Sequence, residues 1–184
     1  MISYIKTRWK TPGGYREFFI IALPLILSTA TWSVQSFIDR VFLAWYSTEA
    51  LAAALPAALT QFIFVSLFLG TATYINTFVA QYIGAKRPHN VGPAVWQGAY
   101  LALIGLLFGL ALGALSTPIF NLIGHEASIR NEEITYFRIL SYGIGPIILS
   151  ASISCFYSGR GKTWTILGVN IFATLINIFL DYGL

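Results

Sequence analysis

Long uncharged stretches alternate with short polar connections along the chain. The stretches Phe18–Ile38, Ala50–Ala85 and Asn90–Gly124 contain no Asp, Glu, Lys or Arg. A helix of about 20 apolar residues is long enough to cross the hydrocarbon core of a bilayer. The pattern therefore predicts an all-α polytopic membrane protein with a single transmembrane domain over residues 1–184. Its five predicted helices cover about 16–39, 50–84, 91–116, 134–158 and 163–184.

The first and fifth predicted helices each carry a polar stripe that ends in an aspartate. The first stripe consists of Ser28, Thr31, Trp32, Gln35 and Asp39. The other stripe is Asn170, Thr174, Asn177 and Asp181, whose spacing of four, three and four residues is also that of Ser28, Trp32, Gln35 and Asp39. Residues three, four and seven apart share one face of a helix, and acids within membrane helices usually face the protein interior. We therefore expect the stripes to line a common cavity, with both aspartates at the same depth.

The second uncharged stretch exceeds one simple span. As a single helix it would measure about 54 Å, against a hydrocarbon core of about 30 Å. One protruding helix returns Lys86 and Arg87 to the side of the basic amino terminus, whereas two spans would place this pair outside. We therefore expect one long helix, on which Thr73 and Asn76 are candidate cavity-lining residues.

Prolines and glycines predict bends and close packing. Pro24 lies in the first half of the first helix and is a candidate hinge, because proline removes a backbone hydrogen bond. Pro118 is expected to end the third helix near Leu115, and Pro146 lies near the middle of the fourth. Gly105, Gly109 and Gly113 recur every four residues, a spacing that lets a neighbouring helix approach closely.

Composition and charge agree with a membrane protein. The chain is 57% hydrophobic and 10% charged, with a mean hydropathy of +0.72. The net charge is +4, and most Lys and Arg residues fall on one side of the predicted threading, which favours a cytoplasmic amino terminus. The charge is thus an orientation signal and gives no support to nucleic-acid binding. The single cysteine, Cys155, lies in an apolar stretch and excludes an internal disulfide.

Two polar connections resemble a metal site and a phosphate-binding loop, but neither has the residues that such a site needs. The segment HEASIRNEE contains His125 and Glu126 side by side, with no second histidine in register for a metal, so we expect a solvated loop. The string GRGKT resembles a phosphate-binding loop, but Phe156 stands where that motif needs glycine. No other nucleotide-binding motif is recognisable, so a transporter built from this chain would need an ion gradient and no cofactor.

Several strings resemble one transporter family. ALPLILSTATWSVQSFIDRVFLAW, EALAAALP and LGTATYINTFVAQYIGAKRP are similar to the amino-terminal half of the multidrug and toxic compound extrusion (MATE) family. YSGRGKT and NIFATLINIFLDYGL resemble the fourth loop and fifth helix of that family. The resemblance implies a twelve-helix antiporter of two six-helix lobes in the bacterial inner (plasma) membrane. Such a protein exports cationic or amphipathic drugs in exchange for Na⁺ or H⁺.

The resemblance also implies a cation site in the amino-terminal lobe, formed here by Asp39, Asn177 and Asp181, where Na⁺ could bind. Two features depart from the family pattern. Five helices make an incomplete six-helix lobe, so we expect the rest of the transporter, its C-terminal half, as a partner besides the lipid bilayer and the drug substrates. In addition, Arg40 follows Asp39 directly and is expected to reach toward the membrane interface.

Three alternatives remain open from the sequence. A lipid-linked oligosaccharide flippase of the same superfamily should have a basic cavity, whereas the polar stripes contain no Lys or Arg. A membrane-embedded lipid-modifying enzyme would need catalytic groups at one interface, but His89 and His125 fall on opposite sides of the predicted threading. A small self-assembling transporter or an inert scaffold fits poorly with an odd number of helices.

Overall fold

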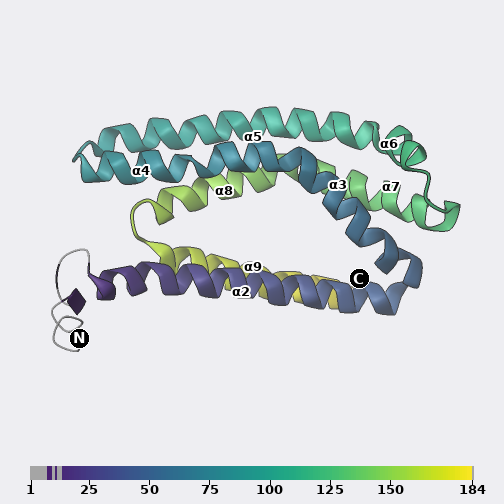
Figure 1. Ribbon diagram of the computed structural model, residues 1–184, viewed down its shortest axis with the longest axis horizontal. Coiled ribbons are helices and arrows are strands. Elements are labelled where there is room, and N and C mark those ends of the chain that lie inside the picture. Colours follow the sequence, from purple (N-terminus) through teal and green to yellow (C-terminus); the bar gives the residue numbers. More distant parts are fainter. Residues whose placement is uncertain (1–7, 10, 12–13, 184) are drawn as a thin grey trace. The chain divides into compact units, whose positions relative to one another are not determined.

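The computed structural model describes residues 8, 9, 11 and 14–183, and within them every regular element is a helix (Figure 1). Lys6 and Lys10 of the basic amino-terminal segment, and Leu184 at the end of the fifth predicted helix, lie outside the described residues. The chain divides into a first unit, which ends at Asp39 and resumes at Gly161, and a second unit, Arg40–Arg160. Each unit is described by itself.

The first unit pairs the beginning of α2 (Tyr15–Tyr46) with α9 (Thr163–Gly183), and the two helices run side by side (Figure 1). Helix α2 continues seven residues beyond Asp39, where the sequence predicted its end. Val41–Tyr46 contains no glycine or proline that would stop a helix, so a charged residue alone does not end it. The helix is also unbroken at Pro24, whose side chain is fully buried.

Helix α3 (Thr48–Thr73) opens the helical packing of the second unit. Ser47 has an extended backbone, and its hydroxyl oxygen accepts a hydrogen bond of 3.1 Å from the Ala50 N–H, which caps the new helix. The predicted single helix 50–84 is in fact two, because α4 (Ile75–Gly84) begins after an interruption at Tyr74. The hydroxyls of Thr71 and Thr73 bond to backbone carbonyls of the preceding turn, a pattern that competes with regular helix bonding there.

The third predicted helix, 91–116, corresponds to one helix, and a further short helix follows it. A short 3₁₀ helix, η1 (Pro88–Asn90), leads into α5 (Val91–Ala114), and α6 (Ser116–Ile123) follows an interruption at Leu115. The break lies where Pro118 predicted it. Pro118 then falls in the first turn of α6, where a helix needs no N–H from that residue. Gly124 ends α6 in the left-handed conformation, with φ of 80°.

The fourth predicted helix differs most from the sequence interpretation. Helix α7 (Ala127–Tyr142) begins seven residues before the expected start, and α8 (Ile144–Ser158) follows after a bend of 43° at Gly143. Pro146 therefore lies in the first turn of α8, where it is favoured, and not in the middle of one long helix. The segment expected as a solvated loop is helical because Glu133, Phe137 and Ser141 share one buried face of α7.

The core of the second unit is made where α3, α5, α6, α7 and α8 meet. Phe120 and Phe137 are fully buried there, with their ring centroids 5.4 Å apart. The predicted glycine seam forms part of this packing, since a side chain on Gly105 would collide with Ile148 and one on Gly109 with the Ser141 carbonyl. Close approach of α5 to the bent pair α7 and α8 thus depends on these glycines.

The helices are long and apolar enough for a multi-pass membrane protein. Four candidate spans are found among the described residues, Tyr15–Tyr46, Thr48–Gly84, Pro88–Ala114 and Thr163–Gly183, and α7 with α8 makes a fifth if the bent pair is one span. The predicted all-α membrane fold is confirmed. The cytoplasmic position of the amino terminus stays a prediction from charge.

Candidate cation site

Asp39 and Asp181 come from α2 and α9 and meet within the first unit. Both side chains are partly buried, and the two carboxyl groups lie within hydrogen-bonding reach of each other. Asn177 precedes Asp181 by one helical turn and is also partly buried. The equal spacing of the two polar stripes therefore corresponds to a real juxtaposition of the two acids.

Among these three residues, two oxygens have no donor. Asp39 Oδ1 and Asn177 Oδ1 are both buried and make no hydrogen bond. A buried oxygen without a partner is costly, and a bound cation would remove that cost. Carboxylate and amide oxygens are suitable ligands for hard cations, so these residues fit a proton shared between the acids or a Na⁺ held by all three side chains.

A hydrogen bond between the two helices supports the site. The Thr174 hydroxyl of α9 donates to Gln35 Oε1 of α2 over 3.1 Å. Gln35 lies one turn before Asp39, and Thr174 lies two turns before Asp181. The bond thus joins the two helices close to the acids.

The remaining stripe residues behave differently from one another. Ser28 is buried, and its hydroxyl oxygen makes no hydrogen bond. Thr31 is partly buried but donates to the Leu27 carbonyl of its own helix over 2.9 Å, and Asn170 is partly buried. The Trp32 side chain is 70% exposed within the chain, so it does not pack between α2 and α9. Their cavity-lining role, like the hinge role of Pro24, stays a prediction.

Thr73 and Asn76 belong to the second unit. Thr73 is exposed, and its hydroxyl donates to the Gly70 carbonyl over 3.0 Å. Asn76 is partly buried, with an Oδ1 that is buried and makes no hydrogen bond. Nearby, the buried Cys155 thiol contacts the carbonyls of Ala72 and Thr73 at 3.8 and 3.5 Å. These contacts place Thr73 and Asn76 around the break between α3 and α4.

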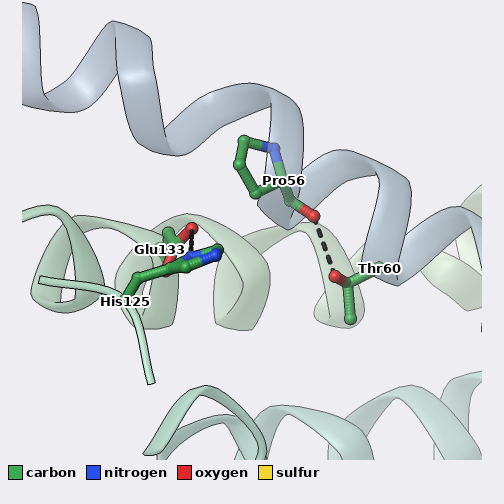
Figure 2. A network of polar contacts seen from close by, with 4 residues as sticks. All are labelled: Pro56, Thr60, His125 and Glu133. Carbon is green, nitrogen blue, oxygen red and sulfur yellow. Dashed lines mark hydrogen bonds and ion pairs between the residues drawn. The ribbon is translucent and has the colours of Figure 1, made fainter. Parts of the chain in front are cut away.

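Sequence reasoning missed one polar pair in the second unit. His125 Nδ1 lies 2.8 Å from Glu133 Oε1, and Glu133 is fully buried (Figure 2). The expectation of a solvated loop is therefore wrong for Glu133. The signal was present, because Glu133 shares a helical face with Phe137 and Ser141, but the polar neighbours of Glu133 concealed it. Among the described residues, no group of three His, Cys, Asp or Glu side chains could hold a metal.

Comparison with known proteins identifies the family. A family model described as MatE matches residues 24–183, which include both polar stripes and the second unit. The chain belongs to the MatE family. The Multidrug resistance protein PmpM of Pseudomonas aeruginosa is 30% identical over 173 residues, which cover 92% of this chain and 36% of that protein. A probable multidrug resistance protein NorM of Synechocystis is 24% identical, over 98% of this chain and 39% of that protein.

A solved structure supports the fold. A MOP superfamily transporter from Pyrococcus furiosus matches with a TM-score of 0.71 at 17% identity, over 90% of this chain and 37% of that one. The chain thus spans well under half the length of the relatives it matches. It is a multi-pass protein of the plasma membrane and belongs to a family of transporters. The membrane-enzyme alternative gains no support from these relatives, and the predicted family resemblance is confirmed.

Proposed function

We propose that this chain forms the amino-terminal lobe of a secondary active transporter. The transporter exports cationic or amphipathic drugs and other toxic compounds by antiport with H⁺ or Na⁺. The observation that carries the proposal is the meeting of Asp39 and Asp181 beside Asn177, with two buried oxygens that lack donors. Similarity to multidrug resistance proteins over a third of their length supports the substrate class and a carboxyl-terminal half as partner.

Electrostatics explains how this site couples to an ion. Two carboxylates in contact and partly out of water resist being ionised together, so the pair tends to retain one cation. A proton shared between Asp39 and Asp181 satisfies this requirement. A Na⁺ also satisfies it, with the Asn177 amide oxygen as a neutral third ligand. Either ion removes the repulsion that pushes α2 and α9 apart.

Ion occupancy then biases the conformation of the lobe. A cation that binds one conformation better than another shifts the population toward the first, and a drug that prefers the second is bound when the ion leaves. Helix α2 carries Pro24, which lacks the N–H that would hold the preceding turn, so α2 has a point of weakness at which it can bend. Antiport follows because ion and drug favour different states of the same helix pair.

The flippase alternative requires different chemistry. A cavity for anionic lipid-linked phosphates calls for Lys or Arg, and the polar stripes of α2 and α9 contain neither. Arg40 adjoins the stripe, but its side chain is exposed, and adjacent helical residues point about 100° apart. The charge at the site therefore favours a cationic ligand.

The test uses the complete transporter in proteoliposomes with a fluorescent cationic drug. We expect drug movement only when an H⁺ or Na⁺ gradient is imposed, and we expect Asp39→Asn and Asp181→Asn each to reduce it to the level of empty liposomes. Glu132→Gln, at an exposed acid on α7, is the matched control and should transport as the wild type does. Gradient-driven transport that persists unchanged in both aspartate variants would refute the proposal.

A further inference from the structure

A second acidic group lies buried in the second unit, away from any role assigned so far. Glu133, in the first half of α7, has no exposed surface, whereas the His125 side chain in the connection between α6 and α7 is 45% exposed. Their atoms Oε1 and Nδ1 are 2.8 Å apart, and the two side chains point toward each other beside the turn of α3 at Pro56 (Figure 2). One partner is therefore open to water and the other is not.

The buried carboxyl group depends on this one contact. Glu133 Oε2 is buried without a hydrogen-bond partner. The polar contact of the carboxyl group is therefore the one between its Oε1 and His125 Nδ1. A buried carboxylate without a compensating charge costs several kcal/mol, and a paired, hydrogen-bonded one costs much less. The charge state of His125 thus decides whether an ionised Glu133 is balanced.

The helices packed against α7 carry no Lys or Arg. Helices α5, α6 and α8 contain no Lys, Arg, Asp or Glu, and Glu49 at the exposed start of α3 is the one charged residue of that helix. On α7, Arg138 donates to the Ser116 and Thr117 hydroxyls. Besides His125 and Glu133, the titratable groups on α7, on the helices packed against it and on the connection are Glu49, Tyr100, Glu126, Arg130, Glu132, Tyr136, Arg138, Tyr142, Cys155 and Tyr157.

The pair also has a mechanical consequence. His125 follows Gly124, the left-handed residue that ends α6, and it reaches over the first two turns of α7 to Glu133. At its other end α6 is held by Arg138 through Ser116. Helix α6 is thus fastened to α7 at both ends, by Arg138 at one end and by His125 at the other.

We propose that His125 and Glu133 form a second proton-binding site, in which the protonated pair fastens the connection after α6 to α7 and loss of the proton releases it. When His125 is protonated, its Nδ1–H donates to a carboxylate of opposite charge. When His125 is neutral, the buried carboxylate loses its counter-charge. The pair therefore stabilises the connection at acidic pH, and this stabilisation is lost as pH rises through the titration of the histidine.

Hydrogen exchange in the complete transporter tests this site directly. Exchange of the amides in residues 117–127 is measured at pH 5.5 and at pH 8.5 and corrected for the intrinsic pH dependence of exchange. A charge-assisted hydrogen bond of the usual strength corresponds to at least about a tenfold difference in local opening, so we expect about tenfold or stronger protection at pH 5.5 in the wild type.

Variants of the pair should remove the pH dependence. We expect His125→Gln and the isosteric Glu133→Gln to show less than about a twofold difference between the two pH values. The matched controls are His89→Gln, which changes the other histidine, and Glu132→Gln, which changes the neighbouring acid. Both should keep the wild-type difference in exchange between the two pH values. His125→Gln changes a partly exposed side chain and carries the test if Glu133→Gln does not fold. A pH-independent wild type, or an unchanged pH dependence in His125→Gln, would overturn the proposal.

Discussion

Unsatisfied oxygens distinguish the acids of the candidate site from ordinary interfacial carboxylates. An aspartate at a membrane interface is solvated, whereas Asp39 keeps one buried oxygen without a donor and lies against a second acid. The amide oxygen of its neighbour Asn177 is likewise buried and has no hydrogen-bond donor. Such an arrangement is unfavourable unless something positive binds there, and this is why we propose a cation at this site.

The hydrogen bond between Gln35 and Thr174 gives a prediction at the scale of one residue. Replacing Thr174 by valine keeps the shape of the side chain and removes the donor. Hydrogen bonds between membrane helices contribute about 0.6 kcal/mol on average and up to about 1.7 kcal/mol, so we expect a loss of stability in this range. Unfolding of the complete transporter in detergent measures the loss. Thr165→Val, at an exposed position of the same helix, is the control and should change stability by less.

Residue spacing predicted which faces meet but not which atoms. The equal spacing in the two stripes placed Asp39 and Asp181 on corresponding faces, because helical geometry alone determines the face. The pairing of Gln35 with Thr174 depends on the offset of α9 along α2, which packing determines. The exposure of Trp32 could not be predicted either, because it shares the periodicity of the buried Ser28.

At the scale of elements, Pro118 and Pro146 mark where α6 and α8 begin. Pro118 and Pro146 each lie three residues after a break, at Leu115 and Gly143, and each falls in the first turn of the following helix. Pro24 and Pro56 lie inside α2 and α3, which continue through them. A proline in the first turn leaves no missing hydrogen bond, whereas one inside a helix leaves a carbonyl of the preceding turn without its donor.

The glycine seam of α5 gives a prediction about helix packing. A Cβ on Gly109 would collide with the Ser141 carbonyl, which belongs to the backbone and cannot rotate away. We expect Gly109→Ala to destabilise the second unit by about 1–3 kcal/mol, as overpacking usually does. The measurement is thermal unfolding in detergent. Gly92→Ala, where a Cβ would meet open space, is the control, and a loss as large as that of Gly109→Ala would contradict the packing account.

Of the two helix breaks that precede a proline by three residues, the one at Leu115 was predicted and the one at Gly143 was missed. Pro118 indicated the end of α5, whereas the interruption at Tyr74 has no proline and coincides with threonine hydroxyls bonded to the backbone. The early start of α7 was missed because charged residues surround Glu133, and a buried carboxyl group looks like a solvated one until its partner is known.

At the scale of the whole molecule, family and membrane fold follow from the sequence, and orientation rests on charge. The alternation of apolar stretches and polar connections predicted the helices, and the MatE match over residues 24–183 agrees with the resemblance carried by the quoted strings. The chain covers 36% of one relative and 39% of another. The central drug cavity of the proposed transporter therefore needs the remaining part of such a protein, while the proposed cation site draws its residues from α2 and α9 alone.

The most direct test of the central claim is the ion released when drug binds. Purified complete transporter is mixed with drug in weakly buffered solution, and released H⁺ is followed with an indicator dye and released Na⁺ with a radioactive tracer. Because Asp39 and Asp181 share one cation in this account, we expect about one ion released per transporter in the wild type, and none in Asp39→Asn or Asp181→Asn. Equal release from the wild type and both variants would contradict the account.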